Sequence, residues 1–594
     1  MAKTPSNSVF GESDFWCKFE CPYPEPYLLF HEGLHFWEYA RNGEDVECRF
    51  ISNFLPIIDT VIEYDNGKTV EKNYLVKGFM VDGRSLPTVN VDSSELLTLN
   101  WVVSKWDASC IIGTQYGARE KLRYAMQTTT GNAKRRVQCG YTGWKKIDGR
   151  WNYLLPGHTS CEVILRGKLR SYMREDGATE HDRAILMGLL QVPVAPRELL
   201  YPTLALVFLS PLNEFLRRAE REPKFIPAIV GRTGSMKTSY AAFLLSFFGS
   251  FSSTDMPMSF RDTANSIIEN SNALKDVLTC VDDYHPSTKG DEATMRSVMQ
   301  VICRGYGDRA GRNRLNSQAQ LMDASPPRGN AIITAESTPC IGESTTARLF
   351  FLEMKPSCLD LKLFSDVQKF ASDGVFRRCL SAYTDWLADT FLTNEKEFVA
   401  NLQHTYDRYR LQCREKIGSK VHARVADAVA CFRIGFDYYI RFLSFCFPSV
   451  DLKIYREEFE KLILLLAEEQ GNYTEQDRPT HLFIRKLMAM IECGEVWLMR
   501  PNASGEPMSG CVGYESEEYY EIFFEQAFRQ VMKFCEAQSV NFTISPQALS
   551  KALAEEGIIL VKNGQNTYTK RYGGNVRRRV MCIIKSEIKN IYGE

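Results

Sequence analysis

The chain has 594 residues, of which 44% are hydrophobic and 24% are charged, and its formal net charge is −1 at pH 7. This length is enough for about three or four globular domains with sizeable cores. The balanced charge excludes a protein that binds nucleic acid through overall basicity, so any DNA contact must come from local basic patches.

The eighteen cysteines are dispersed through core-like segments, as at Cys280 and Cys446. No signal peptide pattern precedes them, and we expect reduced thiols in a cytoplasmic protein. The most apolar stretch, 199–216, is interrupted by Pro202 and Pro211. We therefore expect a buried or interfacial helix pair there, and no contact with a membrane.

Residues 1–182 are predicted to form a mostly β N-terminal domain. Short β-branched and aromatic runs alternate there with glycine turns, the clearest of which are Asn66-Gly67, Asp82-Gly83 and Asp148-Gly149. Two basic clusters, 134–136 and 145–146, are candidates for touching DNA, or are simply basic turns on a solvated surface.

Four residues of this region have a spacing similar to a zinc site: Cys17, Cys21, His31 and His35. The histidines lie in an aromatic-rich alternation typical of a β-hairpin, whereas zinc fingers place them on a helix. The interval between the cysteine pair and the histidine pair is also shorter than usual. The pattern therefore favours strand histidines over structural zinc.

Residues 183–356 are predicted to contain the catalytic core, with helices over 183–221 leading into it. An apolar run ending at Val230 is followed by a glycine-punctuated loop and an apolar helix. Loop N–H groups and the helix N-terminus would bind phosphate, Lys237 would reach the β/γ oxygens and Thr238 would ligate Mg²⁺. The predicted ATP-binding residues are Gly231, Arg232, Thr233, Gly234, Ser235, Met236, Lys237 and Thr238.

Met236 departs from the usual pattern, because a G-x-x-x-x-G-K-[ST] loop has glycine before the lysine. We expect this departure to cost little, since residue 236 would enter the helix with negative φ while Gly231 and Gly234 form the turn. The alternative is an ordinary strand-to-helix turn with a solvated lysine.

A second apolar run, 277–283, ends in Asp282 and Asp283. A parallel central strand presents acids at its carboxyl edge in this way. Asp282 would hold the water shell of Mg²⁺, and Asp283 would orient or deprotonate the attacking water, a role more often filled by glutamate. Many strands end in an aspartate at a turn, so the two aspartates indicate a nucleotide site only in combination with Lys237.

Two further features follow the acidic strand. The buried-strand pattern that starts at Asn330 would place Thr334 or Glu336 beside the γ-phosphate as a sensor, or is a core strand with a turn. Arg348 stands immediately before another apolar strand. In a neighbouring subunit's site it would stabilise charge on the transferring phosphoryl group, as an arginine finger does; alternatively, it forms a structural ion pair.

Long amphipathic patterns with few breakers predict a helical domain over 357–510, which would form a lid on the core.

Residues 511–594 predict a winged helix. A helix from Ser545 to Gly557 precedes two short strands around a turn at 562–566. Its basic residues, candidates for contact with duplex phosphates, are Lys570, Arg571, Arg577, Arg578 and Arg579. Winged helices also bind proteins, so both kinds of partner stay open.

These motifs together resemble those of a known family. The series is the phosphate loop, Thr263-x-Asn265, Val281–Pro286, Arg304–Asp308, Arg312–Arg314, Pro327–Gly329, Thr334–Glu336 and Ala347-Arg348. It is similar to bacterial domain-of-unknown-function ATPases of phages and mobile elements. These include the minichromosome-maintenance-like (MCM-like) replicative helicases of staphylococcal cassette chromosomes. The resemblance runs over most of the chain and is densest between 225 and 355.

The resemblance implies an ATPase of the AAA+ superfamily that assembles into a hexameric ring and unwinds DNA with ATP and Mg²⁺. MCM proteins also lack glycine before the loop lysine. This class inserts a channel-lining hairpin between the acidic and sensor strands, where this chain has Arg309, Arg312 and Arg314. They would contact phosphates without reading sequence, or form a solvated basic turn. Asp283 stands where the family has glutamate, and the sensor position has Thr334-Ala-Glu336 where MCM proteins have asparagine. Both departures leave the water-activating residue open.

The sequence therefore predicts a multidomain α/β protein that acts as an ATP-dependent DNA helicase or translocase of a bacterial mobile element or phage, with single-stranded DNA in the pore of a homohexamer. The alternative is an ATP-switched DNA-binding initiator or scaffold that does not unwind DNA. A primase–helicase fusion is a weaker reading, because the N-terminal part has no zinc ribbon or acidic triad pattern.

Overall fold

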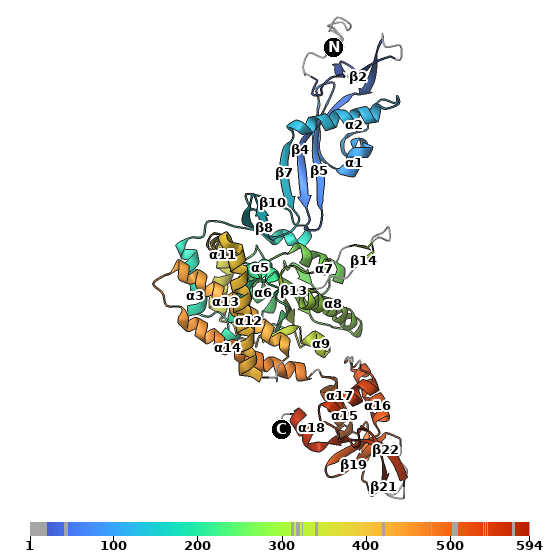
Figure 1. Ribbon diagram of the computed structural model, residues 1–594, viewed down its shortest axis with the longest axis vertical. Helices are drawn as coiled ribbons and strands as arrows, with labels where there is room; N and C mark the ends of the chain where they lie inside the picture. Colours follow the sequence, from blue (N-terminus) through green and yellow to red (C-terminus); the bar gives the residue numbers. More distant parts are fainter. Residues whose placement is uncertain are drawn as a thin grey trace. The chain divides into compact units, whose positions relative to one another are not determined.

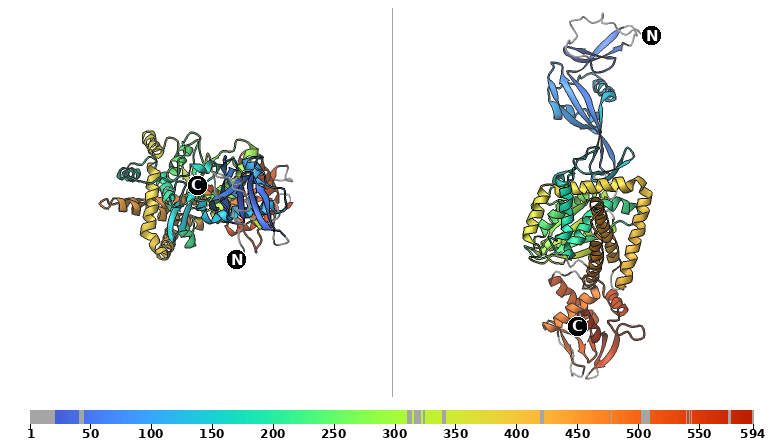
Figure 2. Two further views of the ribbon diagram at one scale, coloured as in Figure 1. Left: turned by 90° about the horizontal axis from the view of Figure 1, so that it is seen from above. Right: turned by 90° about the vertical axis from the view of Figure 1, so that its left-hand side faces the viewer.

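The chain divides into two compact units (Figure 1, with two further views in Figure 2). The first unit holds residues up to 142 and residues 154–165, and the second holds residues 143–153 and those from 166 on. The computed structural model describes residues 21–40, 45–309, 314–315, 321–322, 325–338, 342–418, 422–476, 478–501, 509–538, 540, 542, 544–572 and 576–592.

The first unit is mostly β, as its alternating runs predict. A three-stranded sheet has the order β1-β2-β3, and a five-stranded sheet has the order β10-β7-β4-β5-β6. The elements are β1 Tyr27–Phe30, β2 Gly33–Tyr39, β3 Val46–Ser52, β4 Phe54–Asp65, β5 Val70–Met80, β6 Ser85–Asp92, α1 Ser93–Thr98, η2 Val102–Trp106, α2 Ala118–Thr128, η3 Thr129–Asn132, β7 Lys134–Cys139 and β10 Glu162–Val163. Leu96 of α1 and Leu122 of α2 share a core with Phe54 and Trp101.

A hairpin from the N-terminal region belongs to the second unit, except for its last residue, Leu154. It consists of β8 (Gly143–Ile147) and β9 (Arg150–Leu154), which pair with each other. Trp144 and Trp151 meet Phe215 edge to face, with ring centroids 5.6 and 5.4 Å apart. The first unit therefore ends at 165 instead of 182, and it is interrupted by a hairpin whose packing partners lie far along the chain.

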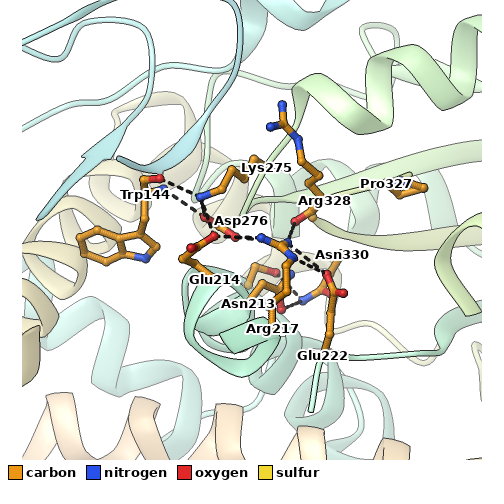
Figure 3. A network of polar contacts seen from close by, with 12 residues as sticks. Trp144, Asn213, Glu214, Arg217, Glu222, Lys275, Asp276, Pro327, Arg328 and Asn330 are labelled. Atoms are coloured by element: carbon orange, nitrogen blue, oxygen red, sulfur yellow. Dashed lines mark hydrogen bonds and ion pairs between the residues drawn. The ribbon is translucent and has the colours of Figure 1, made fainter. Parts of the chain in front are cut away.

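A buried polar network joins this hairpin to the core (Figure 3). The fully buried Asp276 carboxylate accepts a bond of 3.0 Å from the Trp144 N–H, and Lys275 Nζ donates to Trp144 O at 2.7 Å. Burial raises the pKa of Asp276, while the Lys275 and Arg217 charges oppose that rise. Gly143 has φ +90°, and a Cβ there would lie 2.5 Å from Lys275 O, so only glycine permits this approach.

A five-stranded parallel sheet lies at the centre of the second unit, in the order β12-β13-β16-β11-β17. Its strands are β11 Ile226–Val230, β12 Met258–Ser259, β13 Leu278–Tyr284, β16 Asn330–Ala335 and β17 Leu349–Glu353. They are near-continuous apolar runs and almost wholly buried, as expected for parallel strands with both faces covered. Because β16 lies between β11 and β13, the carboxyl ends of these three strands meet at one edge.

Most of the rest of the second unit up to residue 476 consists of helices (Figure 2). They are η4 Gly167–Ser171, α3 Glu180–Gln191, α4 Arg197–Leu209, η5 Ser210–Leu212, α5 Asn213–Arg218, α6 Lys237–Leu245, α7 Ala264–Ala273, α8 Lys289–Asp308, α9 Glu343–Thr346, α10 Leu361–Ser372, α11 Val375–Phe391, η6 Leu392–Asn394, α12 Glu395–Ile417, α13 Ala423–Cys446 and α14 Lys453–Gln476. A short pair, β14 Arg314–Leu315 and β15 Leu321–Met322, follows α8.

The most apolar stretch of the sequence is apolar because it is buried, in part against α13. Within the described residues, one helical stretch, Arg197–Arg218, has the length and composition to cross a membrane, and 94% of its apolar window is buried inside the protein. Gly435 of α13 comes so close that a Cβ would lie 2.0 Å from Ala205 O, and Phe208 stacks on Tyr439 with centroids 4.3 Å apart. The helices after residue 357 thus include one packed directly on α4.

The C-terminal part has a hydrophobic core of its own, which includes Phe483, Val512, Phe528, Leu549 and Ile583. This core begins in α15 and not at residue 511, where the sequence placed the boundary. Its elements are α15 Pro479–Glu492, β18 Trp497–Met499, β19 Cys511–Glu515, β20 Tyr519–Ile522, α16 Phe524–Ala537, α17 Pro546–Glu555, β21 Tyr568–Tyr572, β22 Val576–Ile584 and α18 Lys585–Tyr592.

The sheet of this part has the order β18-β19-β20-β22-β21. The turn predicted at 562–566 exists as a single bridge between Lys562 and Gln565. The hairpin that follows the helix is instead formed by β21 and β22, which pair from Tyr568↔Val580 to Tyr572↔Val576.

Candidate nucleotide site

The predicted phosphate loop connects β11 to α6, which begins at Lys237. A Cβ on Gly231 would lie 2.3 Å from Met354 O, and Gly234 has φ +82°, so both positions need glycine. The Ser235 hydroxyl is buried and has no hydrogen-bond partner among the described residues. A tight loop with an unpaired buried hydroxyl at a helix N-terminus fits a bound phosphate.

Met236 differs from its prediction. It is the N-cap of α6 and has φ +66° and ψ +26°, in the left-handed region, where we expected negative φ. The glycine found at this place in the common motif therefore corresponds to a real backbone requirement, which Met236 meets at a cost of about 1–2 kcal/mol.

Lys237 lies among loop carbonyls and carboxylates. Its Nζ donates to Gly231 O at 2.6 Å and to Arg232 O at 3.1 Å. Burial lowers the pKa of Lys237, and the negative charges of Glu336, Asp282 and Asp283 oppose this effect. This ammonium is thus placed where a phosphate group bound by the loop would be its neighbour.

Thr238 and Asp282 form the oxygen pair expected at a Mg²⁺ site. Thr238 Oγ1 lies 3.1 and 3.2 Å from the two Asp282 oxygens, and Thr334 Oγ1 donates to Asp282 Oδ1 at 2.6 Å. Burial raises the pKa of Asp282, while the hydrogen bonds from Thr334 and Thr238 oppose the rise. A hydroxyl and a carboxylate oxygen side by side are ligands that suit Mg²⁺.

Thr334 forms hydrogen bonds with both aspartates. Besides its bond to Asp282, its hydroxyl accepts a bond of 2.9 Å from the Asp283 N–H, and the side chain is almost fully buried. Asp283 has φ +67° and its side chain is 45% exposed. The second residue predicted as a sensor, Glu336, accepts a bond of 2.6 Å from Thr233 Oγ1 and lies 2.5 Å from His285 Nδ1.

These groups surround one cavity of about 270 Å³. Its lining includes Thr233, Lys237, Thr238, Asp283, Thr334 and Glu336. Residues from the ends of β13 and β16, from the phosphate loop and from the start of α6 therefore come together at this cavity. His285 was not singled out by sequence reasoning, although it lies within the Val281–Pro286 motif.

Arg348 makes an ion pair within its own chain. Its Nη2 lies 2.9 Å from Asp308 Oδ2, and its Nη1 donates to the Ser344 hydroxyl at 2.9 Å. Arg424, at the start of α13, also donates to Asp308, at 3.0 Å. Two arginines thus share one aspartate at the end of α8. Arg424 was missed because no sequence pattern links it to Arg348.

The predicted DNA-contacting arginines of the insertion differ in environment. Arg309 is buried and donates to the carbonyls of Pro223, Pro327 and Gly329 at 2.8, 3.2 and 2.6 Å. This environment is at odds with a phosphate contact, because the guanidinium already anchors the base of the insertion. Arg314 begins β14, whereas Arg312 lies outside the described residues.

The basic residues of the C-terminal hairpin are divided by the strand register. Arg571, Arg577 and Arg579 are exposed. Lys570 and Arg578 pair opposite each other on the other face, where Lys570 Nζ lies 2.6 Å from Glu521 Oε1. The five predicted residues are therefore not equivalent.

The residues with zinc-like spacing are not gathered in the part of the chain that the structure describes. Within it, no group of three or more His, Cys, Asp or Glu side chains could hold a metal ion. Cys17 lies outside the described residues. His35 lies on β2, with its ring edge to face against Phe30 and Phe50 and its Nδ1 3.1 Å from Gly33 O.

No protein-family model and no curated protein matches the chain. Among solved structures, SCCmec type IV Cch, an active helicase, is similar with a TM-score of 0.58 and 13% identity, over 97% of this chain and 100% of that one. JCV helicase, in a complex with an acetamide compound, has a TM-score of 0.21, 14% identity and coverage of 48% and 73%. The likeness shows that this chain shares the fold of Cch over nearly its full length.

Proposed function

We propose that the chain is an ATP-dependent DNA helicase or translocase of the AAA+ type that works as a homohexameric ring. The observation that carries this proposal is the convergence of Lys237, Thr238 and Asp282 at the carboxyl edge of one parallel sheet. The strand order, with β16 between the phosphate-loop strand and the acidic strand, supports the same conclusion. The fold of Cch, itself an active helicase, agrees with it.

Each residue of the site has a separate role in ATP hydrolysis. The N–H groups of the loop and the Lys237 ammonium bind the β- and γ-phosphates, and Thr238 and Asp282 hold Mg²⁺, which neutralises charge on the phosphate oxygens. Thr334 positions Asp282 through a 2.6 Å hydrogen bond. Arg348 acts on the transferred phosphoryl group of a neighbouring subunit, after leaving Asp308.

DNA is the proposed partner of two basic regions. Arg314 belongs to the insertion after α8, which lines the pore and contacts single-stranded phosphates. The C-terminal part acts as a winged helix, and its exposed arginines on β21 and β22 contact duplex phosphates. We assign the protein to the replication of a bacterial mobile element or phage, in the cytoplasm, because its series of motifs resembles that of the ATPases of such elements.

Substitution of the loop lysine tests the proposal. Lys237→Ala should lower the rate of ATP hydrolysis about a hundredfold or more and abolish unwinding, because the variant loses the cation that stabilises the transferring phosphate. The matched control is Lys224→Ala, an exposed lysine just before β11, which should leave both activities unchanged. Equal activity of the Lys237 variant and the wild type would contradict the assignment.

A forked DNA substrate separates unwinding from switching. ATP-dependent release of the labelled strand by wild-type protein, but not by Lys237→Ala, supports a helicase. ATP-dependent binding of the fork without strand release would instead support an initiator or scaffold that uses ATP as a switch.

A further inference from the structure

Glu336 lies at the junction of the two strands that carry the acidic and sensor motifs. It directly follows β16, and His285 directly follows β13, its neighbour in the sheet. The backbone N–H of Glu336 donates to Tyr284 O at 3.3 Å, which continues the pairing of the two strands past their ends. The sheet itself therefore fixes the position of this residue beside the cavity.

The Glu336 carboxylate is held by both of its oxygens. Oε1 accepts a hydrogen bond of 2.6 Å from Thr233 of the phosphate loop, and Oε2 lies 2.5 Å from His285 Nδ1. The His285 N–H in turn donates to Asp283 O at 3.0 Å, which fixes the histidine backbone. A carboxylate with two such contacts is oriented before any substrate binds, which is the condition for efficient general base catalysis.

Asp283, the other candidate for activating the water, has a more exposed environment. Its side chain is 45% exposed, and it lies 3.7 Å from Arg261, which is itself 77% exposed. Exposed pairs of this kind hold a side chain weakly, because water competes for both partners. Glu336, by contrast, is 25% exposed and lines the same cavity.

We propose that Glu336, and not Asp283, activates the water that attacks the γ-phosphate, and that His285 is its positioning residue. The inference rests on the proposed ATPase function. The water oxygen forms a bond to the γ-phosphorus and its proton passes to the Glu336 carboxylate. The bond between that phosphorus and the bridging oxygen breaks, its electron pair stays with ADP, and the products are ADP and phosphate. His285 keeps the carboxylate oxygen directed at the water.

The first test compares two isosteric substitutions in the full-length chain. We measure kcat for ATP with single-stranded DNA present, and Kd for a fluorescent non-hydrolysable ATP analogue. Glu336→Gln should lower kcat at least about a hundredfold while the analogue binds as tightly as before or more tightly. Asp283→Asn should lower kcat less. A larger loss of kcat in Asp283→Asn than in Glu336→Gln would overturn the proposal.

The second test examines the positioning role of His285. His285→Ala should lower kcat about tenfold with Kd for the analogue unchanged, since the carboxylate loses its orientation but the phosphate loop is intact. His285→Asn should recover part of kcat, because an asparagine amide can donate from near the position of Nδ1. In the Glu336→Gln background, His285→Ala should have no further effect. No rescue by asparagine, or additive losses, would refute the positioning role.

These measurements also distinguish the inference from the function on which it rests. Wild-type protein that fails to bind the analogue overturns the ATPase assignment itself. A Glu336→Gln variant that binds the analogue and keeps its kcat within a few-fold of wild type overturns only the role of Glu336.

Discussion

Met236 occupies a backbone conformation that residues with a Cβ avoid, at the point where the phosphate loop enters α6. Its φ of +66° brings Cβ close to the following carbonyl, and this costs about 1–2 kcal/mol relative to right-handed geometry. The conformation persists because Gly231 is packed against Met354 O and Lys237 starts the helix. The strain therefore belongs to the binding loop itself.

Substitution of Met236 by glycine and by alanine should separate the backbone strain from the side chain. Both variants lose the methionine side chain, but only glycine removes the Cβ. Met236→Gly should be more stable than Met236→Ala by about 0.5–1 kcal/mol, after allowance for the greater chain entropy of glycine. The urea midpoint of tryptophan fluorescence measures this difference. Alanine is the more stable residue at ordinary helix positions, so a higher midpoint for Met236→Ala would show that position 236 is unstrained.

At the scale of elements, the hairpin of β21 and β22 presents two faces with different electrostatics. Arg577 and Arg578 are adjacent in β22, but their side chains point to opposite faces, because strand side chains alternate. Arg577 is exposed beside its cross-strand partner Arg571. Arg578 pairs with Lys570, on the face where Glu521 supplies a negative charge.

This alternation provides a matched pair of variants for the proposed contact with duplex DNA. Arg577→Gln should weaken binding and reduce the slope of log K against log salt by about 0.9, the value for one lost phosphate contact. Arg578→Gln removes the same charge from the neighbouring position and should leave the slope nearly unchanged. Titrations of labelled duplex at several salt concentrations measure both slopes. Equal changes in the two variants would show that the net charge of the hairpin, and not one face, attracts DNA.

Elements with strong local patterns were predicted from the sequence. The phosphate loop, the acidic run at 277–283 and the run from Asn330 form loop and strands as expected, because apolar runs that end in polar residues are encoded locally. Features decided by distant partners were not predicted. The β8–β9 hairpin packs on α5, and Arg309 is buried under carbonyls of Pro223 and Pro327. Neither partner can be read from periodicity.

In the candidate site, too, locally encoded features were predicted and contacts between distant residues were not. Lys237, Thr238 and Asp282 come together as their motifs predict, because parallel strands place their carboxyl ends at one edge. The contacts of His285 with Glu336 and of Arg424 with Asp308 could not be predicted, since each joins residues from different elements with no fixed spacing.

For the whole molecule, the environment of Arg348 sets a condition on how the subunits of the proposed ring would cooperate. Within one chain its guanidinium is held by Asp308 and Ser344, and its side chain is 12% exposed. A finger that acts on a neighbouring subunit must leave Asp308, and a carboxylate left without a partner would oppose that step. Arg424 removes this obstacle, because it lies 3.0 Å from the same carboxylate and keeps it paired.

Mixtures of variant and wild-type chains test whether Arg348 acts between the subunits of the proposed ring. Arg348→Ala should fold, because Asp308 keeps Arg424 as its partner, and it should bind ATP like the wild type, because the phosphate loop is untouched. When the variant is mixed with wild-type chains, ATP hydrolysis should fall well below the fraction of wild-type subunits present, since each variant chain disables the site of its neighbour. Steady-state hydrolysis across mixing ratios measures this, with tagged wild-type chains as the control. A loss strictly proportional to the variant fraction would mean that Arg348 acts only within its own chain, through its ion pair with Asp308.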